Sequence, residues 1–316
     1  MDILSGTIAA LRVGSPDAGR FVRHAPWGRE YERIDGAAFH VVLEGSCWLI
    51  PREGEPVRLN VGDIALLYLD RGHGIADNPT TPLTEIAGPA DKPVIDGPGA
   101  RATVLCGIYK FTPGWSHPMF DELPEVVHVP ARLGRHPQLR AAIDLLSAEV
   151  ESEEQGREAM LPALLDALFV YTMRAWYSEA GEDPDADGWA ALLHDEAMLN
   201  ALRAIQTDPG RKWTVEDLGR IAGLSRAHFA RRFTALVGEA PLAYLTRWRM
   251  IAAAKLLREG DGTLASVARE VGYGSEFAFA KAFKRAHGTA PGQYRREFAA
   301  ATTTSAERAL AGASAV

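Results

Sequence analysis

Two short stretches in the last third of the chain carry side chains that can read the edges of DNA bases. Arg231 has a guanidinium fork, which can bond both acceptors on the major-groove edge of a guanine. Arg226 suits a phosphate contact, Lys281 suits guanine or phosphate, and Glu276 suits a cytosine amine. Alanines beside them allow close approach or contact with a thymine methyl. The outward-facing candidates for DNA contact are Arg226, Ala227, Ala230, Arg231, Glu276, Phe277, Ala280 and Lys281.

The same framework of residues surrounds both stretches. Counting from Ser225 and again from Ser275, fifty residues later, the chain places Phe at +4 and +8, Gly at +13, Ala-Pro at +15 and +16, and Tyr at +19. Chance rarely reproduces six spaced identities, so the two copies predict the same local structure. The repeated positions are Phe229, Phe233, Gly238, Ala240, Pro241 and Tyr244, then Phe279, Phe283, Gly288, Ala290, Pro291 and Tyr294.

Each copy predicts a helix-turn-helix that holds its outward residues in place. In the first copy, Thr214 caps a short helix in a capping box with Asp217, Gly223 makes the turn, and Ser225 caps the second helix. The phenylalanines fall on one stripe of that helix, so we assign them to the core. The opposite stripe is either a DNA-reading face or an ordinary solvated face. Between the copies, a helix from Pro241 to Gly260 would fix their separation.

The segment from about His194 to Phe298 resembles the paired helix-turn-helix domain of the AraC/XylS family of bacterial transcription regulators. The residues that carry the resemblance are Val271, Gly272, Tyr273, Phe279, Ala282, Phe283, Lys284, Gly288, Pro291, Tyr294 and Arg295. The resemblance implies a sequence-specific DNA-binding transcription regulator, by family habit an activator, and not an enzyme. It also implies that one monomer inserts two recognition helices into adjacent major-groove turns of double-stranded DNA, roughly 34 Å apart on one face. Family members of this kind are further expected to form homodimers and to contact RNA polymerase.

The distribution of charge agrees with this interpretation. Residues 189–298 contain 17 Lys and Arg against 11 Asp and Glu, whereas residues 1–188 contain 16 against 29. Only the carboxy-terminal region therefore favours a phosphate backbone. Five further cations are either phosphate contacts or solvated charges, namely Arg232, Lys284, Arg285, Arg295 and Arg296.

Composition limits the class of the remaining 188 residues. Two cysteines exclude a disulfide-rich secreted scaffold. The sequence has no run of roughly 18 apolar residues, and Met1 to Ala10 lacks the profile of a signal peptide, so we expect a cytoplasmic protein without membrane contact.

Short apolar runs broken by Gly, Pro and Asp between Phe39 and Val129 predict the strands of a sandwich or small barrel, with a long loop over 79–99. Residues 5–130 resemble the cupin sensor domain found in a subset of the same regulator family. This resemblance rests on Phe39, His40, Glu44, Gly45, Ser46, Cys47, Trp48, Gly62, Asp63 and His73.

The predicted fold class is α+β, with a cupin-like β-barrel, connecting amphipathic helices and an all-α domain with two helix-turn-helix units. The expected domains are an effector-sensing domain over 1–130, a helical connector and linker over 131–188, a DNA-binding domain over 189–298, and a disordered tail over 299–316. The two connector helices, predicted between Pro137 and Ser178, either pack on the barrel or pair with a second chain, and we favour pairing.

Five side chains in the sensor region are candidates for an effector pocket or for redox chemistry, namely His40, His73, Cys47, Cys106 and His117. The close His-x-His pair of metal-binding cupins is missing, so we expect no metal and no cofactor, with His40 and His73 lining a pocket for an unknown small-molecule effector. Cys47 and Cys106 are either small buried hydrophobes or redox-active thiols, with Cys106 near His73 or His117. The alternative functions are a metal-dependent cupin enzyme fused to a DNA-binding domain, and an architectural DNA binder with an inactive barrel.

Overall fold

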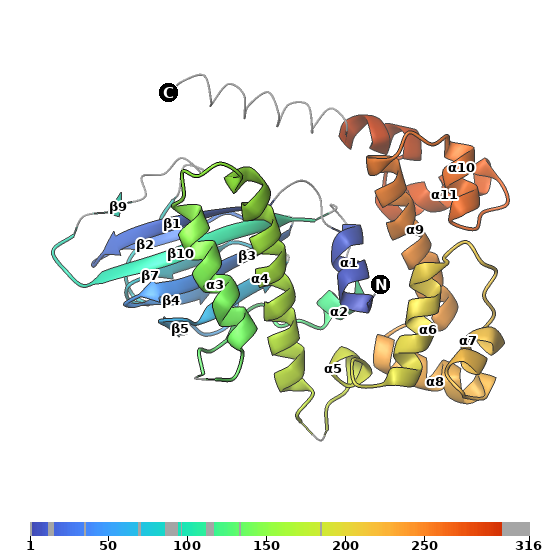
Figure 1. Cartoon of the computed structure of the whole chain (residues 1–316), viewed down its shortest axis with the longest axis horizontal. Helices are drawn as coiled ribbons and strands as arrows, with labels where there is room; N and C mark the ends of the chain where they lie inside the picture. The colour runs from blue at the N-terminus through green and yellow to red at the C-terminus, as the bar shows by residue number, and fades with distance from the viewer. Residues whose placement is uncertain are drawn as a thin grey trace. The chain divides into compact units, whose positions relative to one another are not determined.

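The computed structural model describes residues 2–11, 16–34, 36–68, 71–85, 94–95, 97–111, 117–132, 134–183 and 185–298. These residues form two compact units (Figure 1). The helical unit comprises residues 1–14, 114–118 and 185–316, and the sheet unit comprises residues 15–113 and 119–184. The predicted disordered tail and the middle of the predicted loop over 79–99 lie outside the described residues.

The sheet unit contains two β-sheets. The six-stranded sheet has the order β11-β6-β3-β10-β1-β9, and the five-stranded sheet has the order β5-β4-β7-β2-β8. The strands of the first sheet are β1 Asp17–His24, β3 Gly36–Glu44, β6 Ile64–Tyr68, β9 Val94–Ile95, β10 Arg101–Lys110 and β11 Val127–Val129. Those of the second are β2 Gly28–Tyr31, β4 Ser46–Pro51, β5 Val57–Asn60, β7 His73–Ala76 and β8 Thr84–Glu85.

The predicted barrel is not closed within the described strands. A barrel requires every edge strand to pair with a neighbour. Here the strands at the sheet edges are two to four residues long, as β8, β9, β11 and β5 show, so they offer little backbone for further pairing. The architecture is a sandwich, which the strand pattern also allowed.

An apolar core fills the space between the two sheets. It includes Val42, Cys47, Leu49, Leu59 and Val104, each at most 2% exposed. Strand β3 is buried along most of its length, since its other face is also covered.

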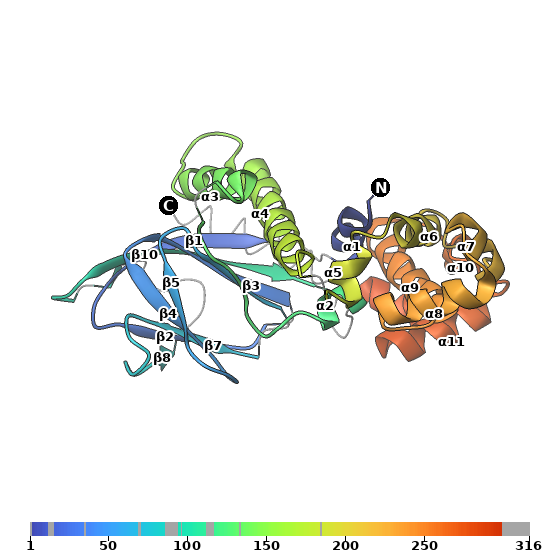
Figure 2. The same ribbon diagram turned by 90° about the horizontal axis from the view of Figure 1, so that it is seen from below.

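Helices α3 Pro137–Val150 and α4 Arg157–Ala180 cover the outer face of the six-stranded sheet (Figure 2). The aromatic rings of Phe111, Phe120 and Phe169 pack together between the sheet and α4, with centroids 5.9 to 6.2 Å apart. The predicted helices are therefore present, and each packs on the sheet of its own chain. That packing uses one face of the helix pair and leaves the other exposed.

The helical unit is built from nine helices and short turns in its described part. They are α1 Ile3–Leu11, α5 Gly188–Leu192, α6 Glu196–Thr207, α7 Val215–Ile221, α8 Arg226–Val237, α9 Pro241–Glu259, α10 Leu264–Glu270, α11 Glu276–His287 and a last helical segment over 291–298. The short α2 Pro118–Asp121 follows His117. The helix predicted from Pro241 to Gly260 is confirmed, with Gly260 as its C-cap.

The local signals that defined each helix-turn-helix are confirmed. Thr214 and Asp217 form the predicted capping box, and Ser225 and Ser275 cap α8 and α11 through their hydroxyls. Gly238 and Gly288, which the sequence repeats, end these helices at φ values of 83° and 73°, in the left-handed region that favours glycine. The repeated residues therefore set both ends of the second helix in each helix-turn-helix.

Two segments that the sequence assigned to the sensor domain belong to the helical unit. Helix α1 packs on α6 and α9, with Ile3, Leu4 and Ile8 buried. Arg258 Nη2 donates to the Ala10 carbonyl over 2.9 Å, and Gln206 Nε2 donates to Thr7 Oγ1 over 3.4 Å. The second segment carries His117. Among the described residues, no helix has both the length and the apolar composition to cross a membrane.

Candidate nucleic-acid interface

Helix α8 presents a polar face because its aromatic face is used for packing. Phe229 and Phe233 are 0% exposed, and Phe233 packs edge-on to Tyr244 of α9 with ring centroids 5.9 Å apart. On the opposite face Arg226, Ala227 and Arg231 are exposed and Ala230 is half-buried. The outward placement predicted for these four residues is therefore what the structure has.

Helix α11 repeats the arrangement with different surface chemistry. Phe279 and Phe283 are fully buried, and Phe283 packs edge-on to Tyr294 at 5.3 Å. The exposed face carries Glu276, Phe277 and Lys281, with Ala280 half-buried.

Phe277 is the most exposed large apolar side chain in the described part of the chain, with 81% of its surface accessible. Its neighbour two positions on, Phe279, fills the core, so packing does not explain Phe277. Phe277 therefore stays among the candidate contact residues on the outer face of α11.

His228 is a further candidate that sequence reasoning missed. It is exposed on α8 between Ala227 and Arg231, and therefore lies on the predicted face. Its position three residues before Arg231 was a sufficient signal, because residues three and four apart share a helix face.

Two of the five additional cations hold the fold together. Arg232 Nη2 lies 2.6 Å from Asp195 Oδ2, and Asp195 is the N-cap of α6. Arg295 Nη2 donates to the Gly262 carbonyl over 2.6 Å. Lys284, Arg285 and Arg296 remain exposed. The first two arginines are thus engaged within the protein.

Inside the sheet unit, three of the predicted sensor residues meet. His40 Nδ1 lies 3.0 Å from Cys106 Sγ, and His40 Nε2 lies 2.7 Å from His73 Nε2. The Tyr31 ring stacks on His73 at 4.9 Å, and its hydroxyl donates to Cys106 Sγ over 3.8 Å. Strand pairing explains the meeting, since Cys106 of β10 is the register partner of His40 of β3.

Burial keeps His40 and the Cys106 thiol uncharged. Desolvation raises the pKa of the Cys106 thiol to about 12 and holds the pKa of His40 well below its usual value. Desolvation also raises the pKa of Cys47, which lies in the sandwich core and is 0% exposed. Both thiols are therefore protonated at neutral pH, and thiolate chemistry would require the cluster to open.

The prediction that His117 lies near Cys106 is wrong. His117 is 0% exposed in the helical unit, where its Nε2 lies 3.0 Å from the Tyr244 hydroxyl. Its ring packs edge-on to Trp189 and Trp248, with centroids at 5.1 and 6.2 Å. Burial lowers the pKa of His117 to about 3. The polar ring is stable there because the Tyr244 hydroxyl supplies a hydrogen bond.

The described residues contain no group of three or more His, Cys, Asp or Glu side chains placed to hold a metal ion. In the His40 cluster, both ring nitrogens of His40 already contact neighbours. The arrangement is a chain of side-chain contacts from Cys106 through His40 to His73.

Comparison with known proteins identifies both regions. A family model described as Cupin matches residues 2–178, and one described as Helix-turn-helix domain matches residues 218–297. A Streptomyces lividans protein described as an AraC-like transcription regulator is 34% identical over 94% of this chain and 98% of its own length. The "RCS-specific HTH-type transcriptional activator RclR" of Escherichia coli is 28% identical over 93% of this chain and 97% of its own.

Among solved structures, the DNA-binding domain of AdpA in complex with a target DNA is 33% identical to this chain. The match covers 34% of this chain and 95% of that one, with a TM-score of 0.32.

Proposed function

We propose, because the chain belongs to the AraC-like family of transcription regulators, that it binds specific sites in double-stranded DNA through the outer faces of α8 and α11. The chain is a DNA-binding regulator with a cupin-type amino-terminal domain. The observation that supports this choice of surface is that the second helix of each helix-turn-helix has one buried aromatic face and one exposed face. Its two phenylalanines are fully buried, and the residues opposite them are exposed.

The two helices suit different base sequences. Helix α8 offers Arg231 to a guanine edge, Arg226 to phosphate, and two alanines that let the backbone approach closely. Helix α11 offers Glu276 to a cytosine amine, Lys281 to guanine or phosphate, and Phe277 to a thymine methyl. We therefore propose a site whose two halves differ in sequence.

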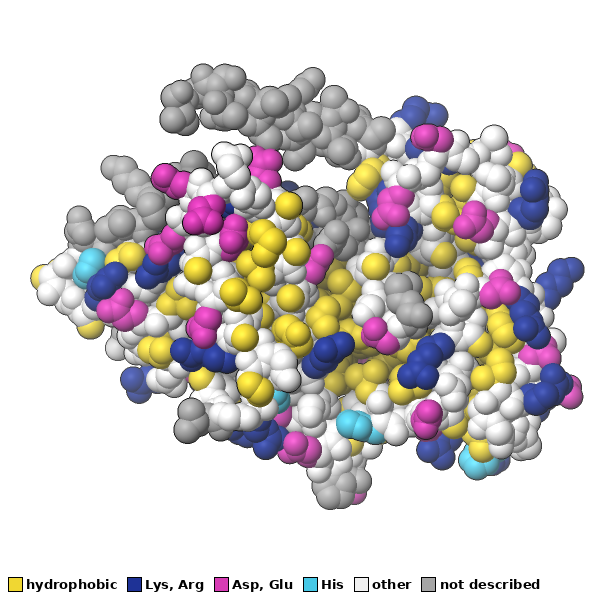
Figure 3. Space-filling view, viewed as in Figure 1, with side chains coloured by type: hydrophobic (Ala, Val, Ile, Leu, Met, Phe, Trp, Pro, Cys, Tyr) yellow, Lys and Arg dark blue, Asp and Glu magenta, His cyan; other side chains and the backbone are white. Residues whose placement is uncertain are grey.

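We further propose that the protein is a homodimer, and that the exposed face of α3 and α4 forms the interface. Leu145 of α3 is 59% exposed and Met160 of α4 is 49% exposed. Hydrophobic side chains gather on the visible face over these two helices (Figure 3). Leu164, Val170 and Tyr171 of α4 are only half-buried by the fold. A second copy would remove this apolar surface from water.

Activation through RNA polymerase and control by an effector in the sheet unit complete the proposal. The Escherichia coli relative is named an activator and matches nearly the whole chain, which supports the sign of regulation. A DNA target also implies a cytoplasmic site of action. The metal-dependent enzyme alternative has less support, because both ring nitrogens of His40 are engaged, one with Cys106 and one with His73.

Footprinting of the full chain on sites selected from genomic fragments tests the proposed DNA interface. We expect protection of two consecutive helical turns on one side of the duplex, since each helix-turn-helix reads one turn. As a control, Lys255→Ala changes a cation of α9 that pairs with Glu259 away from α8 and α11, and should leave the footprint unchanged. Protection limited to a single turn would contradict the proposal.

A further inference from the structure

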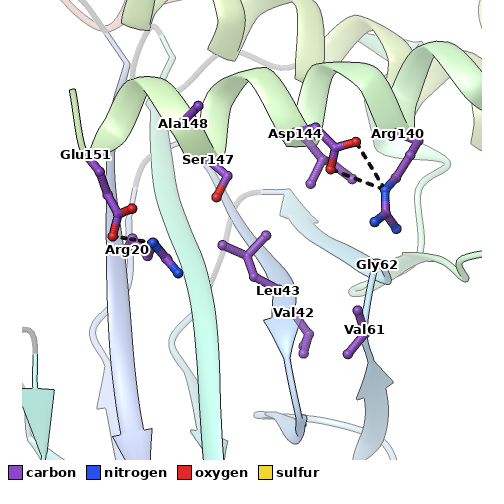
Figure 4. A pocket seen from close by; sticks show the side chains of 11 residues that line it. Arg20, Val42, Leu43, Val61, Gly62, Arg140, Asp144, Ser147, Ala148 and Glu151 are labelled. Atoms are coloured by element: carbon purple, nitrogen blue, oxygen red, sulfur yellow. Dashed lines mark hydrogen bonds and ion pairs between the residues drawn. The ribbon is translucent and has the colours of Figure 1, made fainter. Parts of the chain in front are cut away.

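A cleft lies between α3 and the strands beneath it, outside the sandwich core (Figure 4). Its volume is about 370 Å³, and its wall includes Arg20 of β1, Val42 and Leu43 of β3, and the turn at Val61 and Gly62. Ligand sites in proteins are commonly roughly 300–1,000 Å³ in volume. Because apolar side chains fill the space between the two sheets, this cleft is a better candidate for a ligand site than the sandwich interior.

The cleft has a guanidinium group at each end. Arg20 pairs with Glu151 at one end, and Arg140 pairs with Asp144 at the other, where Arg140 Nε lies 3.3 Å from Asp144 Oδ1 (Figure 4). Ser147 of α3 lies between the two pairs with its hydroxyl toward the strands. Each end of the cleft therefore holds one guanidinium group paired with one carboxylate.

Both guanidinium groups keep donors that their carboxylates do not use. Arg20 Nε is buried and has no hydrogen-bond partner among the described residues, and only Nη1 meets Glu151. Arg140 meets Asp144 through Nε, while its Nη1 lies over Gly62, 2.9 Å from where a Cβ would be. Glycine at position 62 thus leaves room for the guanidinium. A buried N–H without a partner is costly, so Arg20 indicates a missing acceptor.

The spacing of the two ends follows from helix geometry. Asp144 and Glu151 are seven residues apart on α3, Glu151 being its C-cap in helical conformation. At 1.5 Å per residue the two carboxylates, and the arginines they hold, are about 10 Å apart along the helix axis. A ligand that reaches both arginines must be elongated.

Apart from the Ser147 hydroxyl, the middle of the cleft is lined by apolar side chains. Val42 and Ile143 are buried, and Val61 keeps 46% of its surface exposed at the rim. A chain of methylene groups lying there would cover Val61 and contact Leu43.

From this arrangement we infer that the cleft binds a small linear α,ω-dicarboxylate, with one carboxylate on Arg20, the other on Arg140, and the methylene chain over Leu43 and Val61. Arginine binds carboxylates with two parallel hydrogen bonds, which suits the unused donors on both side chains. The ligand would hold β1 and the turn at Val61 against α3. Helix α3 also carries part of the proposed dimer face. The inference rests on the proposed function, in which an effector bound to the sheet unit controls the regulator.

Calorimetric titration of the full chain, without DNA, tests the inference with succinate, adipate, pimelate and suberate. We expect binding that is strongest for one of the longer three, because succinate is too short to span two helical turns. Arg20→Gln and Arg140→Gln should each weaken binding by at least about 10-fold, since each removes charged hydrogen bonds. Arg101→Gln is the matched control, because Arg101 also pairs with a carboxylate on the sheet unit but lies outside the cleft, and it should leave binding unchanged.

Two further arms separate a dianion from other ligands. Glu151→Gln and Asp144→Asn remove the competing carboxylates, so they should tighten dicarboxylate binding. Hexanoate and 6-aminohexanoate should bind at least about 10-fold more weakly than adipate, because they lack the second carboxylate. Preference for 6-aminohexanoate, equal binding of hexanoate, or no binding of any dicarboxylate at millimolar concentration would each overturn the inference. DNA binding measured on the same preparation shows whether the proposed function fails independently.

Discussion

At the scale of single residues, the two helices proposed to contact DNA, α8 and α11, differ in the charges on their exposed faces. On α8 the exposed chemistry is basic, with Arg226 and Arg231 opposite a fully buried aromatic stripe. On α11 an acid, an aromatic ring and a lysine share the face. The two halves of the DNA site should therefore respond differently to substitution and to salt.

Arg231→Ala should relax base choice at one position in the half-site read by α8. A bidentate contact between arginine and guanine discriminates by about 1–3 kcal/mol, and alanine cannot supply it. Binding to a set of sites with each base varied in turn measures the effect. A uniform loss of affinity on all sequences would instead assign Arg231 to phosphate.

Phe277→Ala should weaken DNA binding without lowering the stability of the protein. The side chain is 81% exposed, so its removal leaves no cavity, and the free energy of unfolding should change by less than about 0.5 kcal/mol. If DNA covers the ring, affinity should fall by about 1.5–3 kcal/mol. Leu242→Ala is the matched control, because Leu242 of α9 is also apolar and 44% exposed. Equal effects of both substitutions would count against a DNA contact for Phe277.

At the scale of elements, the helical unit depends on two segments that come from far away in the sequence. Helix α1 and the His117 segment pack in the same unit as helix α9. In the chain, β1 follows helix α1, and β10 precedes the His117 segment. These two strands pair with each other, with Asp17 opposite Ile108. The pair of strands and the helical unit are thus joined by two covalent connections.

Stability should fall with decreasing pH because of His117. Its pKa is about 3 in the folded protein against 6.5 when unperturbed, mainly through burial and next through Arg247. Protons therefore bind the unfolded chain first, so the stability from neutral His117 is complete above pH 6.5 and is lost progressively as the pH falls toward 3. Between pH 7.5 and 5.5 the loss should be about 1.4 kcal/mol.

Denaturant unfolding of the wild type and of His117→Asn at both pH values measures this loss. The variant should show a smaller decrease between the two, since only its His117 contribution is removed and the other histidines still titrate. Tyr244→Phe is the control, because it removes the hydrogen-bond partner but keeps the buried imidazole. An identical pH dependence in wild type and His117→Asn would show that His117 is not buried in the neutral state.

At the scale of the whole molecule, the proposed dimer can be tested through α3. Leu145→Asp places a charge in the centre of an apolar face without touching the core, because Leu145 is 59% exposed. Sedimentation analysis should show that the dissociation constant of the dimer rises by at least about 10-fold, since burial of an unpaired carboxylate is costly. DNA affinity should fall with it through lost avidity. Asp144→Ala, on the same helix at a site already polar, is the control. Unchanged oligomeric state in Leu145→Asp would place any interface elsewhere.

The sequence by itself determined the features that depend on local spacing. Caps at Thr214, Ser225 and Ser275, buried phenylalanines at fixed offsets, and left-handed glycines at Gly238 and Gly288 are each set by residues within one or two helical turns. The long helix between the two copies, α9, and the α+β class were predictable for the same reason. The outer faces of α8 and α11 followed as the opposite of the aromatic stripes.

Only the tertiary structure decided which distant residues meet. His117 bonds Tyr244 at a separation of 127 positions, Arg232 bonds Asp195 at 37, and His40 contacts Cys106 at 66. Nothing in local spacing records such contacts, because they arise when strands select their register and helices bury their apolar faces together. The membership of α1 in the helical unit and the cleft under α3 have the same origin, since both are produced by packing of whole elements.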